Sequence, residues 1–171
     1  MNETPILVQA KQQIAASVPK QFKVVYDRII GSGSKLMWSD QTHAILQKAV
    51  AKIQSPEQIP QAVADGITSA ILTIIHRAKI PPKMEHPFYA ASMPAAQFLA
   101  CDALEYIGQK KGIPITPDLL ASTIKAVVAG MNTLYGITGE VAKQSLAAVQ
   151  QQQEKMGTLQ RQPAQPGQMR G

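Results

Sequence analysis

Apolar residues recur three and four positions apart along most of the chain, which is the spacing of amphipathic helices. The pattern predicts a first helix over Pro5–Ser17, ended by Val18-Pro19, and a second helix over Lys20–Ile30. Gly31–Ser34 predicts a flexible break after the second helix. A third helix, capped by a hydroxyl or a carboxylate, is predicted from Ser39-Asp40 to Gln54.

Two helix starts carry the strongest local signals, Ser55-Pro56-Glu57 and Thr116-Pro117-Asp118. In each, a hydroxyl can cap free N–H groups, proline fits the first helical position, and an acid meets the positive end of the helix dipole. The first start opens an Ile-rich helix that runs to about Lys79 and is expected to be the central helix of the fold. The second opens a helix to about Leu134.

Between these helices, the segment Ala90–Gln109 predicts a further helix that contains Pro94. The proline either kinks this helix or marks its true first turn, and the second alternative is attractive because Ser92 could then cap it. Lys110-Lys111-Gly112 is typical of a helix C-terminus. A last helix is predicted over Thr138–Met156, and its first half alone has an apolar face.

These elements predict an all-α fold, a bundle of six or seven helices with a disordered C-terminal tail. The helical domain is expected to span residues 1–156, with 55–156 as the main bundle and 1–54 either within it or as a separate helical subunit. Residues 157–171 are rich in Gly, Pro, Gln and Arg and cannot bury enough surface to order alone. That tail is either a solubilising end or a peptide that contacts a partner through Arg161, Met169 or Arg170.

Composition adds a preference for close helix packing. Aromatic residues make up 5% of the chain, and the apolar content is carried by Ala, Ile, Val, Leu and Met. Small residues recur four apart, as in Gly66 with Ala70 and Ala126 with Gly130. This spacing lets two helix backbones approach closely, within one bundle or between protomers. We take these four residues as candidate helix-packing positions, and the spacing is compatible with a homo-oligomeric ring or tube.

The charge pattern permits an acidic partner without specifying one. The formal net charge is +6 and the isoelectric point is near 9.5. The basic residues are dispersed and lack the interleaved aromatic residues that stack on nucleic-acid bases. The pattern favours a solvated surface, with non-specific DNA contact as the alternative.

The chain carries no targeting signal that we recognise. Its N-terminus lacks a basic region followed by an apolar core, and its uncharged stretches fall short of the roughly 18 residues of a membrane span. Synthesis in the cytoplasm without a signal peptide is therefore expected. The single cysteine, Cys101, stands in an apolar run and is expected to be a buried small side chain rather than a nucleophile.

Candidate chemistry is sparse. Gly31–Lys35 superficially resembles a phosphate-binding loop but lacks its spacing, and it is interpreted as an inter-helix loop. His43, His76 and His86 are too far apart to form a helical metal-ligand pair. Asp102 and Glu105 share a helix face and could act as an acid–base pair, be balanced by Lys110 and Lys111, or be solvated. We predict no catalytic, cofactor-binding or metal-ligating residue.

Two segments carry a resemblance to a known class of proteins. Ser55–Gly66, continuing through the Ile-rich helix to Gly112–Asp118, resembles small, predominantly helical virion proteins of tailed bacteriophages, which often end in a Gln/Pro-rich tail as here. The resemblance covers residues 55–171, rests on the style of the sequence, and carries over no functional residue.

The resemblance implies a non-enzymatic structural protein of the virion. The first expectation is an internal or ejection protein, packaged near the portal, that oligomerises into part of a conduit for DNA ejection and touches a membrane during delivery. A close alternative is a head-to-tail adaptor (head-tail connector) ring that binds the portal. From a different class, a cytosolic helical adaptor or chaperone remains open, and an enzyme stands last.

Overall fold

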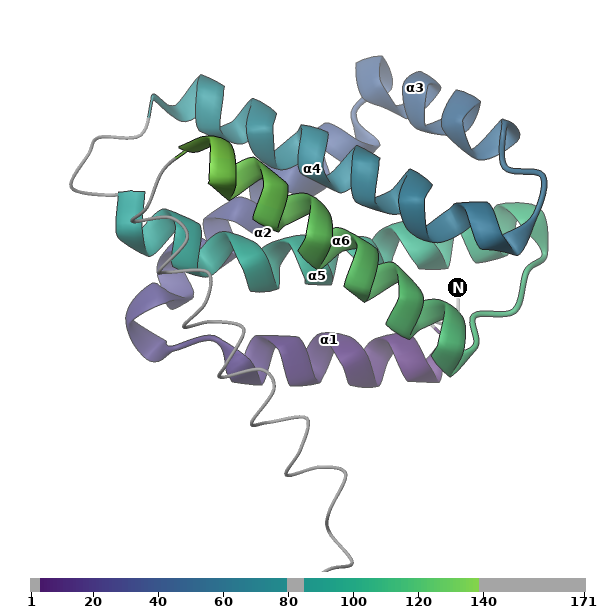
Figure 1. The fold of residues 1–171 in the computed structure, drawn as a ribbon, viewed down its shortest axis with the longest axis horizontal. Helices are drawn as coiled ribbons and strands as arrows, with labels where there is room; N and C mark the ends of the chain where they lie inside the picture. The colour runs from purple at the N-terminus through teal and green to yellow at the C-terminus, as the bar shows by residue number, and fades with distance from the viewer. Residues whose placement is uncertain (1–3, 80–84, 139–171) are drawn as a thin grey trace, which may run out of the picture.

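Six α-helices build the described part of the chain, residues 4–79 and 85–138 of a computed structural model. They are α1 (Pro5–Ser17), α2 (Lys23–Trp38), α3 (Asp40–Ala51), α4 (Ile59–Ala78), α5 (Glu85–Lys111) and α6 (Pro117–Thr138). Two 3₁₀ turns, η1 (Lys20–Phe22) and η2 (Pro56–Gln58), precede α2 and α4. The predicted all-α fold is confirmed (Figure 1). The predicted last helix beyond Thr138 and the tail 157–171 lie outside the described residues.

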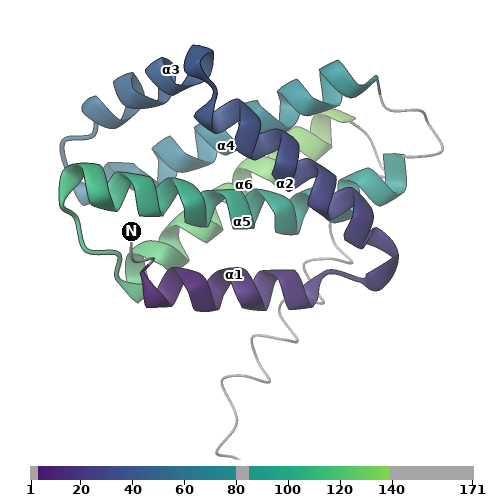
Figure 2. The ribbon, with the colours of Figure 1, turned by 180° about the vertical axis from the view of Figure 1, so that it is seen from behind.

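The centre of the bundle is α5, not the Ile-rich α4 that the sequence favoured. Helices α1, α2, α4 and α6 all pack against α5 (Figures 1 and 2). Nearly every residue from Phe88 to Cys101 is buried. A helix surrounded on all sides has no single apolar stripe, and its many alanines let four neighbours approach its backbone. The periodicity of α4 is stronger because α4 has one buried and one open face.

Helices α1 and α2 share the core of the main bundle. Leu7 and Ile14 of α1 and Tyr26 and Ile29 of α2 are buried in the same cluster as the apolar residues of α4, α5 and α6. Both N-terminal helices pack along α5. In the described residues, α1 and α2 are therefore integral to the bundle, whereas α3 packs chiefly against α2.

The predicted break at Gly31–Ser34 is wrong, because α2 runs through it without interruption. Gly33 is buried where α2 crosses α5, and a Cβ atom at this position would overlap Cδ1 of Leu99. Glycine here serves close packing of two helices rather than flexibility. The interpretation of Gly31–Lys35 as an inter-helix loop fails for the same reason.

Pro94 lies inside α5, so the favoured alternative of a helix start at this proline is also wrong. Ser92 does not cap the helix; its Oγ donates to the carbonyl oxygen of Tyr89 at 2.9 Å. The hydroxyl of Tyr135 from α6 donates to the same carbonyl at 3.2 Å. Pro94 has no N–H to donate to the carbonyl of Ala90 one turn earlier, and both hydroxyls bond the adjacent carbonyl of Tyr89 instead.

The two strong helix-start signals differ in outcome. Oγ1 of Thr116 accepts a hydrogen bond from the N–H of Leu119 at 3.1 Å, which confirms the predicted cap of α6. Ser55 makes no such cap, and a 3₁₀ turn precedes α4 instead. The predicted stop of α5 is confirmed: Gly112 is left-handed with φ 65°, and the N–H of Ile113 bonds the carbonyl of Gly108 at 3.0 Å.

Candidate functional site

An apolar groove of about 690 Å³ lies on the face of α4 that α6 leaves open. Its walls come from α2, α3, α4, α5 and the segment that links α3 to α4. The larger aliphatic side chains in these walls include Leu36, Val50, Ile53, Val63, Ile67 and Ile107. The volume is within the range of ligand pockets, and the lining is suited to apolar surface.

The groove exists because α3 stands apart from α4. Both views show α3 joined to the bundle at the end of α2, with its length away from α4 (Figures 1 and 2). The space between them is lined on the α4 side by the small residues Ala62, Gly66 and Ala70. Small side chains leave room beside a helix backbone for a second helix to approach.

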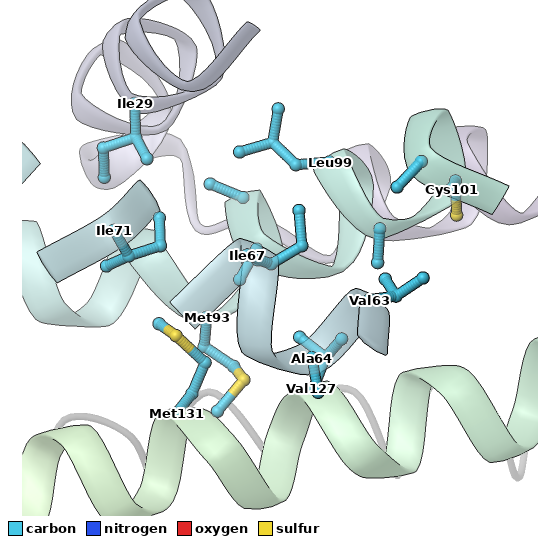
Figure 3. Packing of buried hydrophobic residues seen from close by; sticks show 14 of the residues in the cluster. Ile29, Val63, Ala64, Ile67, Ile71, Met93, Leu99, Cys101, Val127 and Met131 are labelled. Atoms are coloured by element: carbon cyan, nitrogen blue, oxygen red, sulfur yellow. The ribbon is translucent and has the colours of Figure 1, made fainter. Parts of the chain in front are cut away.

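The opposite face of α4 is filled by α6. Figure 3 shows Ala64 beside Val127 and Met93 beside Met131, in the core that α4, α5 and α6 share. At 100° per residue, Ala64 lies on the other side of α4 from Ala62, Gly66 and Ala70. Helix α4 therefore presents one face to the core and one to the groove.

The rim of the groove carries charge at both ends. Asp65 stands near the start of α4, where its Oδ1 accepts a hydrogen bond from Nε2 of Gln61 at 2.8 Å. Arg77 stands in the last turn of α4, is exposed, and has no ion-pair partner among the described residues. Lys52 adds a second cation on the side of α3. The rim therefore offers opposite charges at separate places along one helix.

The predicted helix-packing residues divide between two places. Gly66 and Ala70 line the groove. Gly130 of α6 faces α4, where a Cβ atom at position 130 would lie 2.7 Å from Oγ1 of Thr68. Ala126, on the same helix, is partly buried against the core. The predicted partner-contact residues Arg161, Met169 and Arg170 lie outside the described residues.

Asp102 and Glu105 hold α1 against α5. Asp102 forms an ion pair with Lys11 of α1, and Oε2 of Glu105 accepts a hydrogen bond from the N–H of Thr4 at 3.1 Å. Partial burial works against ionisation of Glu105, but the bonds from Thr4 and Gln109 and the charge of Lys11 outweigh it and lower its pKa. Neither acid lines the groove.

The sequence left open that Lys110 and Lys111 balance this acid pair, and the structure shows contacts to α1 at both acids. The Lys110 ammonium instead lies 5.8 Å from the ring centroid of Tyr106. Asp102 pairs instead with Lys11, which lies on α1 more than eighty positions earlier, and spacing along one helix could not reveal that contact.

Trp38, His43 and Tyr106 form an aromatic cluster that the sequence did not predict. The rings of Trp38 and Tyr106 lie 5.2 Å apart and those of His43 and Tyr106 lie 5.6 Å apart, between centroids. The residues come from α2, α3 and α5, so no local motif marks them. His76 is exposed, and the side chain of His86 lies outside the described residues. Among the described residues no three His, Cys, Asp or Glu side chains are grouped to hold a metal ion.

Cys101 is buried and free, as the sequence predicted. Burial raises the pKa of its thiol to about 12, and the opposing effect of the Lys11 charge is smaller. A thiol so protected is protonated at neutral pH and unreactive.

Comparisons with known proteins leave the groove as the main guide to function. No protein-family model, curated protein or solved structure matches this chain. None of the helices in the described part of the chain is long and apolar enough to cross a membrane.

Proposed function

We propose that this protein is a non-enzymatic structural protein of a tailed-bacteriophage virion that assembles through helix–helix contacts. Within that class we favour an internal or ejection protein that oligomerises into part of a genome-delivery conduit. The observation that carries the assembly role is the apolar groove beside α4, which is lined by small and aliphatic residues and edged with charge.

The lining determines what the groove can recognise. Aliphatic walls bind apolar surface of matching shape, and the small residues Ala62, Gly66 and Ala70 leave space for another helix along α4. Such a site binds by burying apolar area, with charges at the rim setting the orientation of the partner. A subunit of a larger assembly uses a site of this kind.

The virion setting is supported by the sequence. The segments Ser55–Gly66 and Gly112–Asp118 resemble small helical virion proteins, and the net charge of +6 suits a protein packaged beside DNA. A head-to-tail adaptor ring that binds the portal uses the same features, so it is the second candidate. A cytosolic helical adaptor or chaperone would use the groove for a foreign helix and remain monomeric itself.

Light scattering of the purified full-length chain, with and without liposomes, tests the proposal. A defined higher oligomer, or one induced by lipid, supports a virion conduit or ring. A parallel measurement on a chain ending at Met156 asks whether Arg161, Met169 and Arg170 contribute to assembly. A monomer under every condition would overturn self-driven assembly and favour the cytosolic adaptor.

A further inference from the structure

We propose that the groove of one copy binds the segment Glu140–Lys155 of a second copy, which links the copies head to tail. This inference rests on the proposed assembly function and deepens it, because it names the two surfaces that meet. The groove is the acceptor, and the segment that follows α6 is the donor.

The sequence of the donor segment matches the groove in character. On a helix, its apolar residues Val141, Ala142, Leu146 and Val149 fall within one face, and Lys143, Gln144 and Gln150 fall outside that face. All four residues are branched aliphatic or small and suit a narrow groove beside a helix backbone. A short helix with one apolar face is not stable alone in water and gains stability by docking that face.

The placement of α6 favours a second copy over the same chain. In both views α6 ends at the same end of the bundle as α4 (Figures 1 and 2). Yet α6 packs on the side of α4 opposite the groove, with Gly130 against Thr68. A donor from the same chain would have to turn around the end of α4, whereas a donor from another copy meets no such obstacle.

Donor and acceptor are different surfaces of one chain, so each copy can bind one neighbour and be bound by another. Such a heterologous contact closes into a ring when the rotation between copies allows it and otherwise extends as a helical tube. Both outcomes are the assemblies expected of a conduit or an adaptor ring.

Point variants of the full-length chain test the two surfaces. Gly66→Glu places a charged side chain in the groove, and because a Cβ atom there has nothing within 4 Å, the fold should tolerate it. Gly66→Ala is the matched control. On the donor, Val149→Asp charges the apolar face, and Gln150→Asp adds the same charge to the polar face. We expect Gly66→Glu and Val149→Asp each to raise the concentration needed for assembly at least tenfold, with little change in either control.

Cross-linking decides between two copies and one. A chain with Ala70→Cys is mixed with a chain with Val149→Cys and treated with a short bis-maleimide; Cys101 is buried in both and contributes no background. A cross-linked dimer that requires both chains is the expected result. A link formed within a chain that carries both substitutions, while the mixture gives none, would overturn binding between copies and show docking in the same chain.

The measurements distinguish loss of the donor–acceptor contact from loss of assembly itself. Oligomers that form normally in Gly66→Glu and Val149→Asp would refute the donor–acceptor contact while leaving assembly intact. A full-length chain that stays monomeric at every concentration tested would overturn both.

Discussion

Gly33 of α2 lies directly against the side chain of Leu99 of α5, where the two helices pack. A Cβ atom at position 33 would overlap Cδ1 of Leu99, and Leu99 itself is fully buried. Gly31–Ser34 resembles a flexible linker in the sequence, yet it is helical, and Gly33 within it packs against a side chain of the neighbouring helix. Gly31 lies two positions before Gly33 in the same helix. A Cβ atom at position 31 would have no packing neighbour within 4 Å.

Gly33→Ala should lower the free energy of unfolding by about 1 to 3 kcal/mol, because the added methyl group overpacks the crossing with Leu99. Gly31→Ala is the matched control and should raise it by up to about 1 kcal/mol, because alanine is the better helix former in open space. Urea unfolding of the two variants and the parent chain measures both changes. Equal effects of the two substitutions would contradict the contact.

The α4–α6 interface predicts a second effect. Oγ1 of Thr68 is buried without a hydrogen-bond partner among the described residues, and it faces Gly130. Thr68→Val should raise the free energy of unfolding by about 1 kcal/mol, because it removes a buried polar group without a partner. Thr133→Val, at an exposed hydroxyl that donates to the carbonyl of Ala129, should change it by less than about 0.5 kcal/mol. Thermal unfolding compares the two, and a loss of stability in Thr68→Val would count against the prediction.

The thiol of Cys101 should react only when the protein opens. Burial holds its pKa at about 12, so little thiolate exists at pH 8 and the sulfur is covered. We expect labelling by a thiol reagent to be at least about a hundredfold slower in the native chain than in urea. Labelling at the rate of the unfolded chain would show that α5 is not the closed centre of the bundle.

Glu105 should link stability to acid pH. Its pKa is lower in the folded chain than in the unfolded chain, so the folded state binds fewer protons and its advantage is complete above the unfolded pKa. That advantage is lost as the pH falls through the folded pKa. Glu105→Gln should lose less than about 1 kcal/mol at pH 7, because the carboxylate is partly exposed, and should weaken less than the parent chain on acidification.

Urea unfolding of both chains at pH 7 and at pH 3 makes this comparison. The difference in unfolding free energy between them should shrink toward zero at the lower pH. A constant difference would mean that the bond from Thr4 contributes without regard to the charge of Glu105.

The candidate site was within reach of the sequence only in part. Gly66 and Ala70 were recognisable as small residues four apart, and both line the groove. Gly66 and Ala70 face an open groove, whereas Gly130 faces Thr68 of α4. This difference depends on which side of α4 each neighbouring helix occupies. The cluster of Trp38, His43 and Tyr106 depends likewise on three segments that the sequence does not connect.

The sequence by itself determined the helices whose ends are set by neighbours within a few residues. The bounds of α1, the Thr116 cap of α6 and the left-handed Gly112 follow from local hydrogen bonds and backbone preferences. Only the tertiary structure decided that Gly31–Ser34 is helical, that α5 is central and that α4 borders a groove. These features depend on packing between residues far apart in the chain, where the free energy of a close contact overrides local preference.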